Sequence, residues 1–322
     1  MTEAKDRLRQ RVADFESGLS GQLAAANARV DGLLQQVSEL QNKQLSFRNH
    51  KLYYPNNIVT DSIPGEYMRS SNCLARDFYH PEFTEFCRVG QREIVLHRKM
   101  WEHAFVYERL KRYKALTPGN RGLVFGVGLE FMPSLFASFG IDITATDSPH
   151  EGGWTGEHST SLEQLFFSNL IDREMFERHV RFEPCDMNAI PDHLVDYDFC
   201  WSSCAFEHLG SLKHGCDFVI NSVEKTLKIG GVACHTTELN LSSDVHTLEH
   251  PKVSIYRKRD LQQLCRTLEE RGHIVEPLRI EPGDLLPDYL IDVPPFSNDP
   301  HLKLMFGEYV TTSVGIVVRR GR

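Results

Sequence analysis

The stretch Arg121-Gly-Leu-Val-Phe-Gly-Val-Gly-Leu-Glu130, continued by Phe139-Gly-Ile-Asp-Ile-Thr-Ala-Thr-Asp147, decides the fold of this chain. Its first apolar run stops at Gly126, as a parallel strand buried on both faces does. The apolar spacing of residues 131–139 predicts a helix, and residues 141–146 predict a second strand that ends at Asp147. A buried strand, a glycine turn, a helix and a second strand ending at an acid are typical of a βαβ unit in a Rossmann-like α/β fold.

The turn and the acid together predict a nucleoside-binding site. Gly126 and Gly128 let the backbone turn sharply, and their missing side chains leave room for a ligand. Asp147 follows Gly126 by 21 positions, where such a unit places the carboxylate that accepts hydrogen bonds from ribose hydroxyls. A dinucleotide fingerprint needs a third glycine where this chain has Phe131, and Glu130 would repel a pyrophosphate at the helix start. S-adenosylmethionine carries a sulfonium and an ammonium group and no phosphate. These charges therefore favour it over NAD, and a dehydrogenase is the less favoured alternative.

Gly126-Val-Gly128-Leu-Glu130 with Ala145-Thr-Asp147 resembles the first two motifs of class I S-adenosylmethionine-dependent methyltransferases. It is similar to a bacterial subgroup, associated with surface-polysaccharide (O-antigen or capsule) biosynthesis, that writes the loop as G-V-G-x-E-P. Two positions depart from the pattern. The proline is displaced to Pro133, and Val124 stands where the family usually has an acidic residue before the first glycine. The resemblance covers about residues 120–320 and implies a seven-stranded Rossmann-like sheet whose last strand is antiparallel.

The resemblance also implies where S-adenosylmethionine contacts the chain. A third strand is predicted over residues 180–184 and delivers Cys185-Asp186-Met187. In the methyltransferase pattern the acid at Asp186 accepts the adenine amino group, while the backbone N–H of Met187 meets a ring nitrogen. The cofactor-binding residues expected on this basis are Gly126, Gly128, Glu130, Asp147, Ser148, Asp186, Met187 and Ser202.

Candidate catalytic residues follow the fourth and fifth predicted strands, at residues 197–203 and 232–237. The first of these strands leads into Cys204-Ala-Phe-Glu-His-Leu209, which resembles the family segment that ends in an E-H pair. Ligands of doubly wound sheets lie outside the carboxyl ends of the strands. A histidine is largely neutral at pH 7 and can accept a proton, so His208 is the first candidate base and His235 the second. Glu207 or Glu238 would orient whichever histidine acts.

Composition narrows the class of protein. A net charge of −8 and a pI of about 6.0 argue against nucleic acid as a partner. Eight cysteines without paired short spacings indicate free thiols in a reducing compartment. No apolar run is long enough for a membrane span, and the polar start is not a signal peptide, so we expect a cytoplasmic protein. His246-Thr-Leu-Glu-His250 matches a zinc-peptidase string, but Pro251 follows without helical periodicity, and no metal is expected.

The first 47 residues predict a coiled-coil helix. They contain no proline, and a heptad seam runs through Leu19, Leu23, Ala26, Val30, Leu33, Val37 and Leu40. A helix with this stripe needs a partner, which predicts a homo-oligomer. The alternative is a helix packed on its own domain.

Two further segments complete the predicted organisation. Residues 48–90 are aromatic and interrupted by prolines, and are either a cover over the ligand cleft or a surface linker. Residues 91–322 form the predicted methyltransferase domain, which begins with a helix at 91–116. In that helix Arg98 either binds substrate or belongs to a solvated basic face.

The function expected from the sequence is transfer of a methyl group from S-adenosylmethionine to an acceptor hydroxyl. The subgroup resemblance implies a sugar of a surface glycan as the acceptor. Two alternatives stay open: a methyltransferase for small metabolites, and a coiled-coil scaffold whose cofactor-binding domain is not catalytic.

Overall fold

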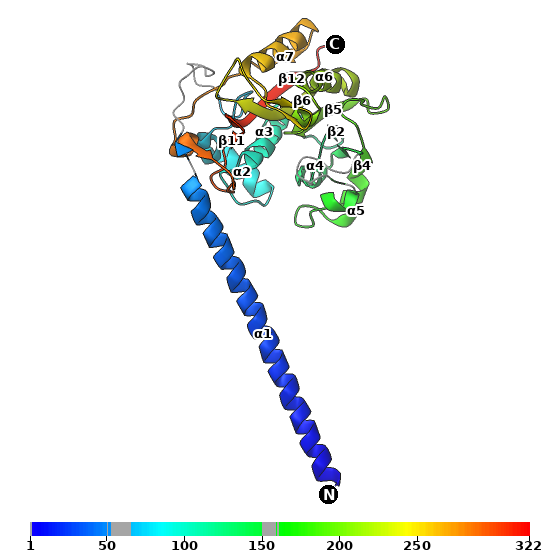
Figure 1. Cartoon of the computed structure of the whole chain (residues 1–322). Coiled ribbons are helices and arrows are strands. Elements are labelled where there is room, and N and C mark those ends of the chain that lie inside the picture. The colour runs from blue at the N-terminus through cyan, green and yellow to red at the C-terminus, as the bar shows by residue number, and fades with distance from the viewer. Residues whose placement is uncertain (1, 50, 53–65, 150–158, 160) are drawn as a thin grey trace. The chain divides into compact units, whose positions relative to one another are not determined.

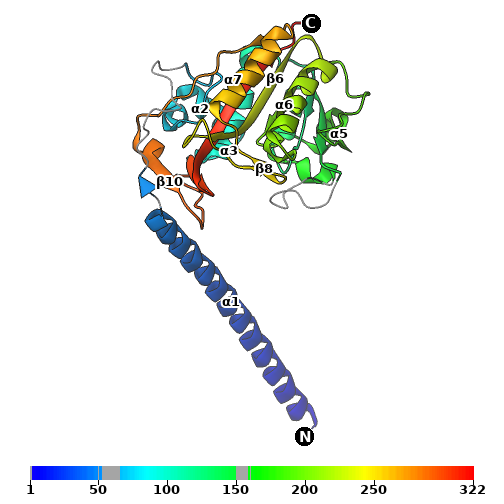
Figure 2. The same ribbon diagram turned by 45° about the horizontal axis from the view of Figure 1, so that its top comes forward.

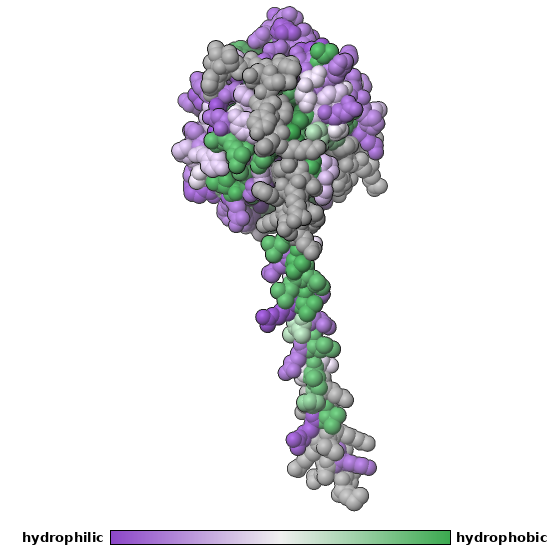
Figure 3. Space-filling view, turned by 60° about the vertical axis from the view of Figure 1, so that its left-hand side comes forward, coloured by the Kyte–Doolittle hydropathy of each residue, from purple (hydrophilic) through white to green (hydrophobic). Residues whose placement is uncertain are grey.

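The computed structural model describes residues 2–49, 51–52, 66–149, 159 and 161–322, and the chain forms two compact units, Met1–Asn49 and His50–Arg322. The first unit is one 48-residue helix, α1 (Thr2–Asn49) (Figure 1). Apolar side chains form a green stripe along it in Figure 3. The large exposed ones are Val12, Phe15, Leu19, Leu23, Val30, Leu33, Leu34, Val37 and Leu40. None of the helices in the described part of the chain has the length and apolar character of a membrane span.

The second unit is built on one mixed sheet, which has ten strands among the described residues. The order β4-β3-β2-β5-β6 is parallel throughout, and β12 then pairs antiparallel with both β6 and β9. This arrangement confirms the predicted Rossmann-like sheet with an antiparallel last strand. Three short strands, β1, β10 and β11, extend it beyond β12. The strands are β1 (Lys51–Leu52), β2 (Arg121–Val124), β3 (Asp142–Asp147), β4 (Val180–Pro184), β5 (Tyr197–Ser203), β6 (Leu227–Asn240), β9 (Ile274–Val275), β10 (Leu290–Asp292), β11 (Lys303–Phe306) and β12 (Tyr309–Arg319).

The chain order of the strands creates a switch point between β2 and β5. From β2 the chain runs outward through β3 and β4, and it then returns to the other side of β2 to form β5. Connections therefore leave the carboxyl ends of β2 and β5 in opposite directions, and in doubly wound sheets ligands bind at this edge. A separate two-stranded hairpin, β7 (Glu249–His250) with β8 (Val253–Ser254), lies outside the main sheet.

Helices cover both faces of the sheet. One apolar core packs the first group of helices against one face, and a second core packs α6 and α7 against the other (Figure 2). The first group is α2 (Pro81–Val89), α3 (Arg98–Arg112), α4 (Met132–Ala137) and α5 (Arg173–His179), and the second is α6 (Leu212–Asn221) and α7 (Lys258–Glu270). Because strand side chains alternate, Phe199 and Trp201 join the first core while Cys200 joins the second.

Several predicted boundaries are wrong, and local contacts explain two of them. The helix expected at 91–116 begins only at Arg98, because the ring Nδ1 of His97 caps it by accepting the Lys99 N–H at 3.0 Å. The sequence of residues 161–171 also predicts a helix, but the structure has only a 3-10 helix at Leu162–Leu165. The Ser134 hydroxyl bonds the Leu165 carbonyl at 2.7 Å and the Phe167 N–H at 3.0 Å, so both groups are lost to helical bonding.

Other boundaries differ in extent. Residues 212–227 predict a helix, which in the structure ends at Asn221 and continues as a π-helical turn, Ser222–Thr226. Residues 273–280 predict a sixth strand, which is limited to Ile274–Val275, and residues 282–302, whose proline content predicts a loop, contain the 3-10 helix Leu286–Tyr289 and β10. The strands predicted at 180–184 and 197–203, and the last strand that the alternating pattern of residues 309–319 predicts, are confirmed at both ends.

Residues 66–90 are part of the second unit's core. Met68, Phe83 and Phe86 are fully buried, which rules out a surface linker for this described part. The side chain of Asn72 exchanges two hydrogen bonds, of 2.9 and 2.8 Å, with the backbone of Glu281. Residues 53–65 of the same predicted segment lie outside the described residues.

Candidate active site

The loop of residues 125–131, which we call the glycine loop, follows β2 directly. Gly126 and Gly128 have φ angles of +61° and +52°, which residues other than glycine rarely adopt. A Cβ atom at Gly126 would also lie 2.8 Å from the Cβ of Ala205. The Val127 N–H donates to the Thr146 carbonyl at 3.0 Å, so the loop is tied to the end of β3. Both glycines are therefore required by the backbone itself.

Asp147 lies at the carboxyl end of β3 with its carboxylate held against the glycine loop. Its Oδ2 accepts the N–H groups of Gly128 and Ser159, each at 2.9 Å, and its Oδ1 accepts the Ser148 N–H at 2.8 Å. Three backbone donors fix the orientation of this buried carboxylate. The structure thus brings together Gly128, Asp147 and Ser148, which the sequence had assigned to one cofactor site.

Glu130 is buried at the end of the glycine loop. The indole N–H of Trp201, from β5, donates to its Oε2 at 3.2 Å. The Nε2 atom of His103, from α3, lies 3.6 Å from its Oε1. The carboxylate is therefore anchored beside the start of α4, where a phosphate would meet a like charge and a cationic group an opposite one.

Asp186 and Met187 reach the same edge from the end of β4. The Cys185 N–H donates to the Asp147 carbonyl at 2.8 Å, which fixes the segment beside β3. Asp186 is exposed, and its Oδ1 accepts the Asn188 N–H at 2.8 Å. The sulfur of Met187 lies 3.7 Å from the Cβ position at Gly126. Asp186 and Met187 therefore lie beside the glycine loop at the carboxyl end of β4.

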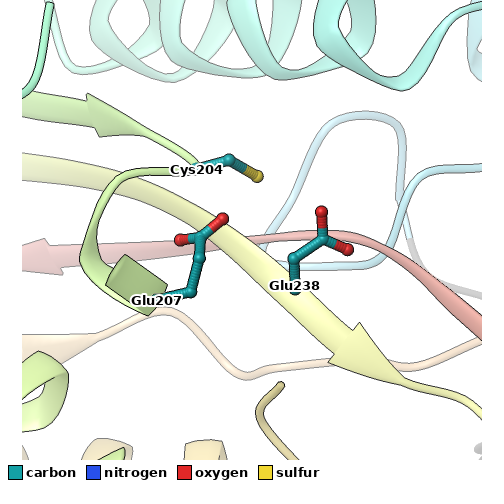
Figure 4. A group of neighbouring side chains, drawn as sticks. All are labelled: Cys204, Glu207 and Glu238. Atoms are coloured by element: carbon teal, nitrogen blue, oxygen red, sulfur yellow. The ribbon is translucent and has the colours of Figure 1, made fainter. Parts of the chain in front are cut away.

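A second group of polar side chains lies at the ends of β5 and β6. Cys204, Glu207 and Glu238 form a cluster in which one ligand atom from each residue lies within 4.8 Å of the others. Figure 4 shows the sulfur and the two carboxylates converging from the segment after β5 and from β6. The Thr237 hydroxyl donates to Glu207 Oε2 at 3.0 Å, and burial raises the pKa of Glu207.

The first turn of α3 brings two cations to this cluster. Arg98 forms an ion pair with Glu238, and its side chain is only 18% exposed, so the solvated basic face considered for it is wrong. The ammonium of Lys99 lies 2.6 Å from a carboxylate oxygen of the fully buried Glu102 and donates to the Ser203 carbonyl at 3.1 Å. Ser313, from β12, donates to the other oxygen of Glu102 at 2.6 Å.

Sequence reasoning had missed most of this network. It assigns Cys204 no role beyond that of a free thiol, and it assigns no role to Lys99, Glu102 or Ser313. The one available signal was the spacing of Arg98, Lys99 and Glu102, which places both cations within three or four residues of an acid on a helix. Ser313 carried no signal, because its role depends on β12 lying beside β6.

His208 is held by a backbone carbonyl rather than by either glutamate expected to orient it. Its Nδ1 lies 2.7 Å from the carbonyl oxygen of Lys252. A carbonyl only accepts, so Nδ1 carries the hydrogen and the lone pair of the neutral ring is on Nε2. The residue closes the 3-10 helix Phe206–His208 at the carboxyl end of β5. This is the tautomer that a proton-accepting Nε2 requires.

His235 and Ser202 do not reach the site. His235 is fully buried against α6, because alternation along β6 turns it away from the face that carries Glu238. The Ser202 hydroxyl lies 2.8 Å from its Nδ1, and the Ser222 oxygen lies 3.0 Å from its Nε2. Ser222 donates its own hydrogen to the Val219 carbonyl, so it accepts from Nε2–H. Burial lowers the pKa of His235 to about 3. The expectations that His235 is the base and that Ser202 contacts the cofactor are therefore wrong.

No protein-family model matches the chain, and no curated protein matches it. Among solved structures it is similar to a putative sarcosine dimethylglycine methyltransferase from Galdieria sulphuraria, with 20% identity, a TM-score of 0.34 and coverage of 47% of this chain and 50% of the other. It is also similar to phosphoethanolamine N-methyltransferase 2 of Haemonchus contortus in complex with S-adenosyl-L-methionine (16% identity, TM-score 0.34, 53% and 37% covered). A third is a putative S-adenosylmethionine dependent methyltransferase from Listeria monocytogenes (13%, 0.42, 67% and 96%). The chain thus spans about half or less of the length of the first two proteins. All three are similarities of fold.

Proposed function

We propose that the protein transfers a methyl group from S-adenosylmethionine to an acceptor hydroxyl. The observation that carries the proposal is the Asp147 carboxylate, hydrogen-bonded to the glycine loop beside the switch point of the sheet. A carboxylate in this place accepts hydrogen bonds from the two hydroxyls of a ribose. The glycine loop ends at a second carboxylate, Glu130, which suits a ligand with an ammonium and a sulfonium and opposes one with a pyrophosphate.

In this proposal three carboxylates bind different parts of S-adenosylmethionine. Asp186 would accept the adenine amino group, Asp147 the ribose hydroxyls, and Glu130 would attract the ammonium of the methionine part. The bound cofactor supplies a methyl group on a positively charged sulfur. What the chain contributes is alignment, because an in-line displacement gains much of its rate from holding the two reactants in position.

His208 is the proposed general base. His208 would accept the proton of the acceptor hydroxyl at its Nε2 atom when the methyl group is transferred. The Lys252 carbonyl keeps Nδ1 protonated, so that the lone pair stays on Nε2. Glu207 and Glu238 then serve the acceptor rather than the histidine, since Glu207 is bonded to Thr237 and Glu238 to Arg98.

The proposed acceptor is a sugar hydroxyl of a surface glycan, with a small metabolite as the second candidate. The proposal rests on the resemblance of the glycine loop to the polysaccharide subgroup. The carboxylates and hydroxyls around Glu207, Glu238 and Ser313 offer hydrogen-bond partners to a polyhydroxylated molecule. Incubation with labelled S-adenosylmethionine and either a lipid-linked glycan extract or a small-molecule extract will identify the labelled product.

Calorimetry with Asp147→Asn tests the cofactor site. We expect the wild type to bind S-adenosylmethionine and the variant to bind it at least about tenfold more weakly, since a hydrogen bond to a charged group contributes about 1.5–3 kcal/mol. Asp142→Asn is the matched control, because Asp142 is an exposed residue at the other end of β3. Its affinity should equal that of the wild type. Binding of NADH in place of S-adenosylmethionine would contradict the proposal.

A further inference from the structure

We propose that Cys204, Glu207 and Glu238 bind a divalent metal ion. Their ligand atoms lie within 4.8 Å of one another and converge on one space (Figure 4). Cys204 directly follows β5, Glu207 lies on the 3-10 helix Phe206–His208, and Glu238 lies near the carboxyl end of β6. A tetrahedral zinc site separates its ligand atoms by about 3.5 Å, so each side chain has to shift by about 1 Å or less to reach a common ion.

An orphaned carboxylate oxygen points to this ligand. The Glu238 side chain is only 9% exposed, and Arg98 pairs with its Oε1. Its Oε2 is buried and has no hydrogen-bond partner among the described residues. A buried carboxylate oxygen without a partner costs free energy, which hydrogen bonding or a cation offsets. The other two members of the cluster bring a sulfur and a carboxylate oxygen within 4.8 Å of an oxygen of Glu238.

The charge of the surrounding network has room for a cation. Three buried carboxylates, from Glu102, Glu207 and Glu238, face two cations, Arg98 and Lys99. With Cys204 as a thiol, one negative charge is left over. A divalent ion bound to the thiolate would make the group neutral, since binding releases the thiol proton.

The backbone aims the sulfur into the cluster. Cys204 has a φ angle of +51°, a conformation that residues other than glycine rarely adopt. Two hydrogen bonds hold it there, because its N–H is 3.0 Å from the Thr236 hydroxyl and 3.1 Å from the Thr236 carbonyl. The turn that follows brings Glu207 back beside the sulfur.

The chemistry of the three ligand atoms indicates which metal ion the site binds. Mg²⁺ and Ca²⁺ prefer sites made of oxygen alone, whereas one thiolate with two carboxylates suits Zn²⁺ or a neighbouring transition metal. Three protein ligands leave a tetrahedral ion one open position. If the proposed methyl transfer is correct, that position is where the acceptor hydroxyl would bind, and this role alone rests on the proposed function.

Metal titration of the purified full-length chain, stripped with a chelator and free of cofactor and acceptor, tests the site. Co²⁺ should bind with one equivalent and give a thiolate charge-transfer band in the near ultraviolet. Cys204→Ser should abolish the band, and Glu238→Gln should weaken Zn²⁺ binding at least tenfold. Cys216→Ser is the matched control, because Cys216 is a half-buried thiol on α6 outside the cluster, and it should leave both unchanged.

A measurement on the unaltered chain guards against variants that fail to fold. Bound Zn²⁺ should protect Cys204 from alkylation, followed by mass spectrometry, and should leave Cys216 and Cys265 reactive as before. Absence of binding, or binding to Cys204→Ser as tight as to the wild type, overturns the metal site. S-adenosylmethionine binding is measured separately. A chain that binds the cofactor but no metal refutes only this inference, and the reverse result refutes only the proposed function.

Discussion

At the level of single residues, the position of one ring nitrogen decides what His208 can do. Its Nδ1 is committed to the Lys252 carbonyl, so a proton can be accepted only at Nε2. His214 offers a close comparison, because its Nδ1 also lies near a carbonyl, that of Leu209, at 3.0 Å. His214, however, is an exposed residue of α6 rather than a residue at the carboxyl end of β5.

His208→Ala should lower turnover by about two to four powers of ten, the range expected for loss of a general base. Affinity for S-adenosylmethionine should stay within about twofold, because the proposed contacts to adenosine lie on Asp147 and Asp186. His214→Ala should keep the turnover of the wild type. Steady-state kinetics with the identified acceptor, together with calorimetry of cofactor binding, measures both quantities. Near-normal turnover of His208→Ala would mean that alignment alone carries the reaction.

His235 and Glu238 show how far residue types and spacing could predict the site. The sequence suggested that the fifth strand ends at residue 237, which put both residues near its carboxyl end. The strand in fact runs from Leu227 to Asn240, so both lie inside it and alternate faces. His235 packs against the ring of Phe218 on the α6 side, and Glu238 forms an ion pair with Arg98 on the α3 side. The glycine loop was predictable because its glycines and Asp147 follow from local backbone geometry.

At the level of elements, residues 66–90 are joined to α3 through a buried polar contact. The Trp101 indole donates to Asp77 Oδ2 at 2.7 Å, and Asp77 lies on the 3-10 helix Ala75–Tyr79. Burial raises the pKa of Asp77 from 3.8 to about 7. The folded state therefore binds the carboxyl proton of Asp77 more tightly than the unfolded state does. The contribution of this difference to the free energy of unfolding is complete only below about pH 4.

As pH rises from about 4 to about 7, this contribution to the free energy of unfolding should be lost, and it should stay lost above pH 7. Asp77→Asn keeps an acceptor for Trp101 but cannot ionise. The change in unfolding free energy between pH 4 and pH 7 should therefore be smaller in the variant, by up to about 4 kcal/mol. Chemical denaturation at several pH values measures this difference. Asp192→Asn, at an exposed position, should follow the wild type, and parallel curves for Asp77→Asn and wild type would contradict the assignment.

Elements were predictable where periodicity alone determines them. The strands at 180–184 and 197–203 were found to the residue. The first alternates apolar and polar side chains at the edge of the sheet, and the second is a mostly apolar run that is buried almost throughout. The helix expected at 161–171 failed because Ser134, far away in sequence, takes two of its backbone groups. Such a competing partner leaves no trace in the local pattern.

At the level of the whole molecule, the exposed apolar stripe of α1 predicts that another protein chain binds this helix. Its exposed stripe has valines at positions 30 and 37 and leucines at 19, 33 and 40, all of which are half-exposed or more. Valine in one seam position and leucine in the other favour a two-stranded coiled coil. We propose that a second copy of the chain covers this stripe.

Removal of residues 1–49 should lower the mass measured by light scattering to that of one chain and leave S-adenosylmethionine binding unchanged, since the cofactor residues lie in the other unit. Leu33→Glu in the full-length chain should have the same effect on mass, because it places a charge in the seam. Ala25→Glu, also exposed on α1 but off the seam, is the control. If neither truncation nor Leu33→Glu alters the mass, α1 does not join copies.

The position of β12 has a consequence for how the protein is made. The strand pairs with β6 over nine residues, from Thr311 to Arg319, and its Ser313 and Gly315 bond residues 71–73 from far earlier in the chain. During synthesis, β6 therefore exposes an unpaired edge until residues 309–319 have emerged. Non-local pairing of this kind is slow, and an open strand edge is prone to join another chain. The second unit must acquire its final packing after translation has passed β12, and a nascent chain halted earlier would be a candidate for aggregation or for chaperone binding.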